Sequence, residues 1–197
     1  MFLDDQTIMK YFSVKCLYQK DNVIFQEYDL CERIGLVMRG ELQLIHYTYN
    51  GEKRLLAKLT KGDLFGDFLI NSIFPYYPGD LIAKKDSEIS FLDKKSLNAL
   101  LKKNDKFRHY FLSQLSDKAL QLNHHNKILL QSSLREKINM WLSYEIIRHQ
   151  SKKIMISSKE ALANYLNVTR PSLSRELIHM KQEGIIDYTK KYIELLS

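Results

Sequence analysis

The sequence predicts an α+β fold in three successive parts: a small antiparallel β-roll, a long helix and a C-terminal winged helix-turn-helix. Six of the seven glycines lie at or before Gly79 and separate short stretches rich in β-branched and aromatic residues, which is typical of short antiparallel strands. From Lys94 onward the apolar spacing becomes helical, and two short helices and a hairpin follow. We place the boundaries at residues 1–97, 98–131 and 132–197.

Seven short strands are expected in the first part. They cover residues 23–28, 34–38, 41–49, 53–59, 64–68, 81–83 and 88–92. The dipeptide Asn50-Gly51 lies between two of them and predicts a hairpin with a type I′ turn, because both residues tolerate positive φ. Regularly spaced strands with turn residues between them favour a small barrel or roll.

The second part carries an apolar seam with the 3-4-3-4-3 spacing of a coiled coil. Its members are Leu112, Leu115, Ala119, Leu122, Asn126 and Leu129. A single polar Asn in such a seam often fixes the register of two paired helices, so we expect dimerisation through this helix, although part of the stripe would also pack on the roll of its own chain. His124 and His125 on the same helix are expected to be solvated.

The third part begins after residues 131–133, which we interpret as a hinge. Ser133 and Glu136 match a capping box at the start of a helix, and residues 154–156 predict a brief strand. After Gly184, residues 185–188 and 192–195 predict two strands that turn at Lys190 and Lys191. This hairpin is the expected wing.

The helix-turn-helix is expected between Ser157 and Ile186. A first helix over residues 158–166 leads into a turn at Asn167, a residue that tolerates a left-handed backbone. Thr169 is placed to cap a second helix, whose first turn suits Pro171. Leu173 and Leu177 would pack inward.

Two arginines of this second helix, Arg170 and Arg175, are expected on outward faces near its N-terminal end. That end enters the major groove in a helix-turn-helix, and arginine is the usual partner of guanine O6 and N7. A surface-charged helical hairpin of some other fold is the alternative.

Charge and composition agree with a DNA-binding protein. The net charge is +7. Residues 1–97 carry a net charge of −1, whereas residues 98–131 and 132–197 carry a net charge of +4 each, as contact with phosphate requires.

No apolar run could span a bilayer, and the acidic N-terminus is unlike a signal peptide. Cys16 and Cys31 do not suggest a disulfide scaffold. We therefore expect a cytoplasmic protein that does not act at a membrane. No nucleophile–base pair, metal-ligand spacing or phosphate loop supports an enzyme.

The order of these parts resembles the catabolite-activator/Fnr (Crp/Fnr) family of bacterial transcription regulators, over nearly the whole chain. Residues 162–177 carry the resemblance most specifically, and residues 61–67 look like the strand that leads into the family's ligand-binding turn. The resemblance implies a cyclic-nucleotide-binding-like roll. It also implies base contacts from Arg170, Pro171 and Arg175, and phosphate contacts from Ser158, Thr169 and Ser172. Pro171 cannot accept a hydrogen bond from a base, which leaves the half-site sequence open.

The sensory residues depart from the family pattern. Cyclic-nucleotide binding in the family uses Gly-Glu on the turn and an Arg-Ser or Arg-Thr pair for the phosphate, whereas this turn reads Gly66-Asp67. No arginine occurs between Arg54 and Arg108, and lysine lacks the bidentate fork that suits phosphate. We therefore expect that cyclic AMP does not bind well.

Redox and metal cofactors are not expected either. Two separated cysteines cannot supply the thiolates of an iron–sulfur cluster, and nothing in the spacing of Cys16 and Cys31 marks them as a reactive pair. His46 could serve a haem, but its alternation with Leu42 and Leu44 favours a half-buried structural histidine. No metal site is predicted.

An aromatic pocket is the remaining candidate for an effector site. Aromatic side chains cluster around the turns where the family binds effectors: Tyr47, Tyr49, Phe68, Phe74, Tyr76 and Tyr77. Such a lining suits an apolar or aromatic small molecule, but the rings could equally fill the roll. The candidate effector-binding residues are Tyr47, Gly66, Asp67, Phe68, Tyr77, Pro78 and Gly79.

The leading hypothesis is a homodimeric regulator that reads a near-palindromic operator with two recognition helices. An effector other than cyclic AMP would shift the dimer between two geometries. RNA polymerase is a further candidate partner, although no motif marks a surface for it. The alternative is a ligand-binding signalling module whose winged helix contacts protein rather than DNA.

Overall fold

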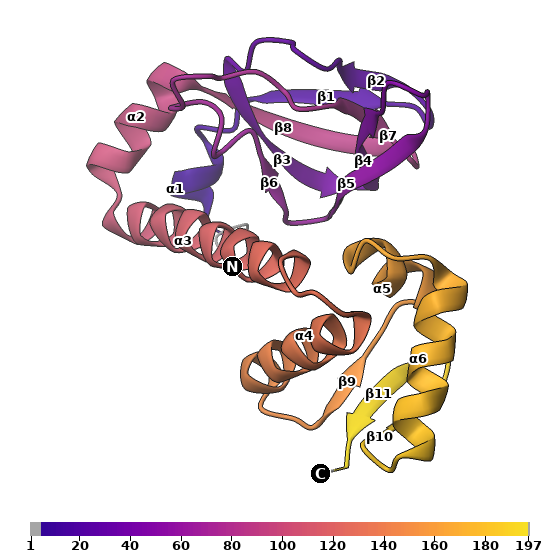
Figure 1. Ribbon diagram of the computed structural model, residues 1–197. Helices are drawn as coiled ribbons and strands as arrows, with labels where there is room; N and C mark the ends of the chain where they lie inside the picture. Colours follow the sequence, from indigo (N-terminus) through magenta and orange to yellow (C-terminus); the bar gives the residue numbers. More distant parts are fainter. Residues whose placement is uncertain (1–4, 197) are drawn as a thin grey trace. The chain divides into compact units, whose positions relative to one another are not determined.

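The computed structural model describes residues 5–196, and the chain forms two compact units, Met1–Ser116 and Asp117–Ser197 (Figure 1). Most of the acidic N-terminus considered above, residues 1–4, lies outside the described residues. Within residues 5–196, no helix is both long and apolar enough to cross a membrane. The fold is α+β, as the sequence predicts.

The first unit is built mainly from eight strands. In chain order its elements are α1 (Gln6–Met9), β1 (Val14–Tyr18), β2 (Val23–Phe25), β3 (Arg33–Arg39), β4 (Glu41–Tyr47), β5 (Lys53–Thr60), β6 (Leu64–Phe65), β7 (Asp80–Ala83), β8 (Ser87–Asp93) and α2 (Lys94–Lys103). The strands form two antiparallel sheets, in the orders β1-β8-β3-β6 and β2-β7-β4-β5. This is the expected antiparallel β-roll.

Both sheets contribute to one apolar core. Leu36 of β3, Leu42 of β4 and Leu81 of β7 are at most 1% exposed. Strand β3 is buried at four consecutive positions rather than at alternate ones. Phe12 after α1 and Leu97 of α2 belong to the same core, so helical segments cover the face of β3 that the other sheet leaves open. Figure 1 shows α1 and α2 beside the strands.

Seven of these strands fall where the sequence predicts them, and β1 was not predicted. Two predicted strands end early. Tyr28 has a φ of +68°, and β2 stops at Phe25. Strand β6 stops at Phe65, before Gly66 with a φ of +75°. A backbone with positive φ leaves the extended region of a strand.

The hairpin between β4 and β5 is confirmed, but its predicted type I′ turn is wrong. The Gly51 N–H donates to the Thr48 carbonyl over 2.8 Å, and the Thr48 N–H donates to the Glu52 carbonyl over 2.9 Å. Gly51 has a φ of +76°, whereas Asn50 is not among the residues with positive φ. A type I′ turn needs positive φ at both central residues. The loop is therefore one residue longer, and Gly51 alone takes the left-handed position.

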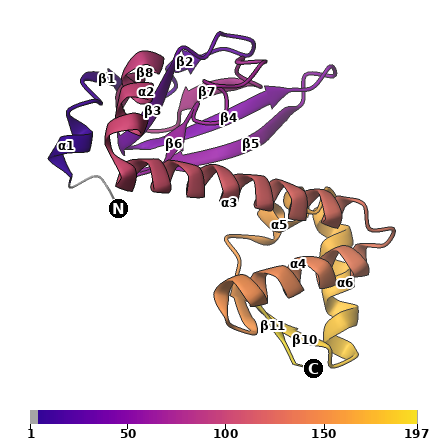
Figure 2. The ribbon, with the colours of Figure 1, turned by 90° about the vertical axis from the view of Figure 1, so that its left-hand side faces the viewer.

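The helix expected over residues 98–131 is divided. Helix α2 ends at Lys103 and α3 (Asp105–Leu129) begins after Asn104, whose backbone is extended at φ −129° and ψ 100°. The Asn104 side chain accepts from the Phe107 N–H over 2.9 Å, which caps α3 at its N-terminus. Figure 2 shows α3 as one uninterrupted helix. The predicted boundary at residue 97 falls inside α2.

The second unit contains the end of α3 and a small mixed domain. Its further elements are α4 (Leu134–His149), β9 (Lys153–Met155), α5 (Lys159–Tyr165), α6 (Arg170–Gln182), β10 (Ile186–Tyr188) and β11 (Tyr192–Leu195). The strands form an antiparallel sheet in the order β10-β11-β9. Trp141 of α4, Leu162 of α5, Leu177 of α6 and Ile193 of β11 share one core. The winged helix-turn-helix is thus present in the predicted order.

Candidate nucleic-acid interface

The first helix and the turn of the helix-turn-helix have the predicted local structure. The Ser158 hydroxyl oxygen accepts from the Ala161 N–H over 3.0 Å and caps α5. The Val168 N–H donates to the Ala163 carbonyl over 2.9 Å, and Asn167 has a φ of +53°. An asparagine at this position reverses the chain with little strain, so α6 follows α5 after a short turn.

The second helix, α6, is fixed at its start by Thr169. The Thr169 hydroxyl oxygen accepts from the Ser172 N–H over 3.3 Å, and the two hydroxyl groups lie 2.8 Å apart. Pro171 occupies the first turn, where a missing N–H leaves no helical bond unmade. Leu173 and Leu177 are fully buried. The predicted cap and the predicted inward face are both confirmed.

Arg170 and Arg175 lie on the solvent side of α6, as predicted from the sequence. The structure assigns neither guanidinium an ion pair or a side-chain hydrogen bond with the residues it describes, so all their donors are available to a ligand. Five helical positions turn through about 140°, and the two side chains therefore point in different directions. Arg175 lies opposite the buried face, whereas Arg170 lies at the edge near the turn.

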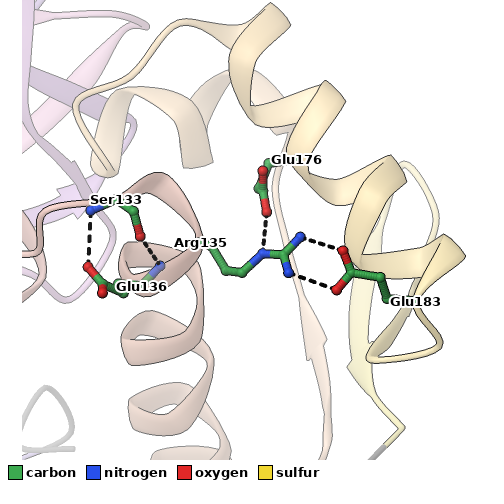
Figure 3. A network of polar contacts seen from close by, with 5 residues as sticks. All are labelled: Ser133, Arg135, Glu136, Glu176 and Glu183. Carbon is green, nitrogen blue, oxygen red and sulfur yellow. Dashed lines mark hydrogen bonds and ion pairs between the residues drawn. The ribbon is translucent and has the colours of Figure 1, made fainter.

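A clamp that the sequence did not reveal holds α6 against α4 (Figure 3). Nε of Arg135 donates to Glu176 over 2.6 Å, and its two terminal nitrogens donate to both carboxylate oxygens of Glu183 over 2.7 and 2.8 Å. These hydrogen bonds raise the pKa of the Arg135 guanidinium and lower that of the Glu183 carboxyl. We call these three residues the Arg135 clamp. A planar fork that binds Glu176 within α6 and Glu183, the residue directly after it, limits the rotation of that helix.

The Arg135 clamp lies next to the capping box of α4. Ser133 accepts from the Glu136 N–H, and the Glu136 carboxylate accepts from the Ser133 N–H over 3.1 Å (Figure 3). This confirms the predicted capping box. Because the cap fixes the first turn of α4, it also fixes the backbone that carries Arg135.

The wing has its predicted turn at Lys190 and Lys191, both of which are exposed. The Thr189 N–H donates to the Tyr192 carbonyl over 2.9 Å and closes the turn. The Ile156 N–H donates to the Lys191 carbonyl over 2.8 Å. The tip of the wing is therefore tied to the end of β9, and the two lysine side chains remain free to meet an anionic surface.

The seam of α3 is mostly uncovered in the single chain. Five of its six members are exposed: Leu112, Ala119, Leu122, Asn126 and Leu129. Leu115 is half-buried against the core of the first unit, so the packing of this stripe on its own roll is limited to one seam residue. Exposed leucines at this spacing are typical of a helix that pairs with another.

The predicted effector residues are not brought together into one lining. Tyr47, Phe68 and Pro78 are exposed, whereas Asp67, Tyr77 and Gly79 are buried. The ring of Tyr77 stacks on Phe25 with centroids 4.4 Å apart, and burial raises the pKa of its hydroxyl. Tyr77 thus fills the roll, which is the alternative that the sequence left open for these rings.

The remaining aromatic candidates lie nearer the surface. Tyr49, Phe74 and Tyr76 are all exposed, and Phe74 packs only against Tyr76, with centroids 4.8 Å apart, among the ring contacts that the structure describes. Gly66 lies where the effector turn was predicted. A Cβ on it would approach the Cys31 sulfur to 3.0 Å, so the turn packs directly on the roll. Burial raises the pKa of the Cys31 thiol.

The prediction for His46 is confirmed, whereas the prediction that His124 and His125 are solvated is wrong. His46 is half-buried, and its Nδ1 lies 3.1 Å from the Glu27 carboxylate, which confirms a structural role. His124 and His125 are not freely solvated. The ring of His125 stacks on Tyr165, and its Nε2 lies 2.7 Å from the Tyr165 carbonyl. The ring of His124 packs on Tyr144 at 3.9 Å. His124 therefore joins α3 to α4, and His125 joins α3 to α5 of the helix-turn-helix, pairings that helical spacing cannot reveal.

Metal binding finds no support among residues 5–196. No three histidine, cysteine, aspartate or glutamate side chains in that range are grouped so that they could hold an ion. Cys16 and Cys31 are both free thiols.

Comparison with known proteins agrees with this architecture. The profile of the cyclic nucleotide-binding domain matches residues 15–104, and that of the Crp-like helix-turn-helix domain matches residues 136–197. The chain is 23% identical to the cyclic AMP receptor protein of Thermus thermophilus over 178 residues, 90% of this chain and 81% of that protein. It is 25% identical to the regulatory protein HlyX of Actinobacillus pleuropneumoniae over 184 residues, 90% of this chain and 75% of that protein.

Solved structures share the fold. A CooA mutant from Carboxydothermus hydrogenoformans superposes with a TM-score of 0.73 at 19% identity, over 98% of this chain and 88% of that chain. The c-di-GMP responsive global regulator CLP of Xanthomonas campestris superposes with a TM-score of 0.61 at 16% identity, over 98% and 100%. The roll, the long helix and the winged helix-turn-helix therefore recur in this order in known regulators.

Proposed function

The chain belongs to the Crp/Fnr family of transcription regulators and carries its DNA-binding helix-turn-helix, and from this premise we propose that it is a homodimeric, sequence-specific regulator that reads DNA mainly through Arg175. The observation that carries the proposal is the pair of exposed, unpaired arginines at the start of α6, on a helix held in place by the Arg135 clamp.

The proposed contacts divide into base readout and phosphate binding. The Arg175 guanidinium would donate two hydrogen bonds to O6 and N7 of a guanine, and Arg170 would reach a neighbouring base from the edge of α6. Pro171 would contribute shape, because it has neither a donor nor an acceptor beyond its carbonyl.

The hydroxyl groups suit phosphate oxygens. Ser158 and Thr169 already accept backbone N–H groups through their oxygens, which leaves the hydroxyl hydrogen of Ser158 to donate. Thr169 and Ser172 share one hydrogen bond, so one hydroxyl hydrogen of that pair is also available. Lys190 and Lys191 at the wing would add charge contacts to the backbone.

The dimer is proposed from the uncovered seam of α3. Burial of Leu112, Leu122 and Leu129 against a second copy removes apolar surface from water, which is the main favourable term in association. Two copies of α6 would then read two half-sites about one helical turn apart. The operator is therefore expected to be a near-palindrome.

Control by a small molecule other than cyclic AMP is the last part of the proposal. The named relatives differ in effector, because one is called a cyclic AMP receptor protein and another is described as c-di-GMP responsive. Since Tyr77 and Gly79 are buried, the exposed candidates Tyr47, Phe68 and Pro78 are the side chains that a ligand would meet first. Binding would shift the dimer between two geometries through residues 131–133.

The test is selection of genomic DNA fragments by the purified full chain at near-physiological salt, with the bound DNA read by sequencing. A palindromic motif is the expected result. The Arg170→Ala, Arg175→Ala double variant should lose the motif, and Arg54→Ala, an exposed arginine of β5, should keep it. If the double variant recovers the same motif, α6 is not the reading element. If it binds no motif but still retains a protein partner of the wild type, the winged helix serves protein binding.

A further inference from the structure

We propose that Pro171 and Ile178 form an apolar stripe on α6 that recognises the C5-methyl groups of thymine. The inference rests on the proposed DNA-binding function and deepens it, because it assigns part of the sequence preference to apolar contacts. Neither the helical spacing nor a contact within the described part of the second unit assigns a role to Ile178.

The two side chains lie on one line along the helix. Seven positions correspond to nearly two full turns, so Pro171 and Ile178 point in directions only about 20° apart. Leu173, Leu177 and Met180, which anchor α6 in the core, occupy the opposite side and are fully buried. The stripe therefore faces away from the domain, on the side that a major groove would meet.

Ile178 is left uncovered by its own chain. It is 44% exposed, whereas the three anchor residues of the same helix are 0% exposed. Its immediate neighbours on the outward side are polar, among them Arg175 and Gln182. Since the second unit leaves 44% of this residue in contact with water, binding of DNA would remove that remaining apolar surface from water.

The floor of the major groove offers such a side chain one apolar partner, the methyl group of thymine. An isoleucine placed against that methyl removes apolar surface from water on both sides. Placed against the amino group of cytosine or adenine, it would strip water from a donor and give no hydrogen bond in return. The stripe would therefore favour thymine and penalise its replacement.

Spacing makes the inference specific. Pro171 and Ile178 are about 10 Å apart along the helix axis. The rise per base pair is about 3.4 Å along the DNA axis, and the groove runs obliquely to that axis, so this distance covers about two to three base-pair steps. Arg175 lies between them on an adjacent line of the same face. The expected half-site has two methyl-sensitive positions about two to three base pairs apart, with a guanine contact of Arg175 between them.

Deoxyuridine tests the methyl contact directly, because it differs from thymidine only by the C5-methyl group. The probe is a set of duplexes of the selected operator in which one thymine at a time is replaced by deoxyuridine, titrated with the full chain. Wild type should bind about fourfold more weakly when the replaced thymine is at either of the two sensitive positions of a half-site, the factor expected for one buried methyl-sized group. Ile178→Ala should lose the sensitivity at one position and keep it at the other, and Pro171→Ala should show the reverse.

The matched control is Ile147→Ala, which removes an exposed isoleucine of α4 and should keep both sensitive positions. Unchanged melting temperatures of the variants show that they fold. Equal binding of every deoxyuridine duplex by wild type, or the wild-type pattern in Ile178→Ala, overturns the stripe while leaving sequence-specific binding intact. Recovery of no motif in the genomic selection overturns the proposed function, and the stripe with it.

Discussion

At the scale of single residues, the proposed readout of DNA sequence depends on Arg175. Arg175→Ala should weaken binding to the operator by about 1–3 kcal/mol and relax the preference at one base pair, because a bidentate contact is lost. Lys190→Gln should weaken operator and random DNA alike and lower the salt slope by about one, because it would remove the proposed phosphate contact. Fluorescence anisotropy titrations at several salt concentrations separate the two effects. Equal losses on both DNAs for Arg175→Ala would contradict its role in base readout.

The Arg135 clamp gives the second unit a pH dependence. The pKa of the Glu183 carboxyl lies below its ordinary value of 4.5 because Arg135 donates to it. A carboxyl with a lowered folded-state pKa contributes stability above the unfolded value, and this contribution is lost as the pH falls through the folded value. The melting temperature of wild type should therefore fall more steeply below about pH 4.5 than that of Glu183→Gln.

Glu160→Gln is the control for this pH dependence, because Glu160 is an exposed carboxylate of the same unit with no contact to the clamp. It should follow the wild-type profile between pH 3 and pH 7. A Glu183→Gln profile that runs parallel to wild type over the acidic range would show that the clamp does not govern acid stability.

At the scale of elements, the N-terminal cap of α4 sets the stability of the helix that carries Arg135. Ser133→Ala removes the hydroxyl that accepts from Glu136 and should lower the free energy of unfolding of the second unit by about 1 kcal/mol. Ser143→Ala alters the same helix in its interior, where alanine is the better helix former, and should be neutral or slightly stabilising. Thermal denaturation of the two variants side by side checks the opposite signs.

The seam of α3 predicts where the proposed dimer would be sensitive to charge. Leu122 and Leu120 are 70% and 55% exposed on the same helix, but only Leu122 belongs to the seam. Leu122→Glu should shift the protein from dimer to monomer, since the carboxylate would be buried without a partner, whereas Leu120→Glu should remain dimeric. Sedimentation velocity at micromolar concentration measures both, and dissociation of the Leu120 variant alone would place the interface on another face.

At the scale of the whole molecule, the first unit matches the cyclic nucleotide-binding domain, but the chain has no arginine between Arg54 and Arg108 for a cyclic phosphate. Cyclic AMP at millimolar concentration should therefore leave the melting temperature unchanged, whereas a ligand present at 100 times its Kd would stabilise the chain by about 2.7 kcal/mol. Differential scanning fluorimetry across a panel of small metabolites checks this expectation and identifies an effector at the same time. A clear upward shift with cyclic AMP would contradict the expectation that this ligand does not bind well.

Most of the fold could be predicted because short stretches specify it. Strand positions, the capping box at Ser133, the Asn167 turn and the Thr169 cap depend on neighbours within four residues. The two wrong predictions of local structure also come from reading short stretches alone. Asn50-Gly51 favours a type I′ turn locally, but the pairing of β4 with β5 selects a longer loop. The α2–α3 break at Asn104 was missed because the seam alone does not reveal where a helix starts.

In the candidate DNA-binding site, too, features set by nearby residues were predictable and features set by contacts between distant segments were not. Local sequence was enough to place the helix proposed to read DNA, its two arginines and the wing lysines, because helical spacing and turn chemistry specify their positions. Three other features became visible only in the folded chain: Arg135 binds Glu176 and Glu183, 41 and 48 residues away, His125 stacks on Tyr165, and Tyr77 is buried instead of lining a pocket. These outcomes depend on which surfaces meet when distant segments pack together, and spacing along a chain carries no information about that.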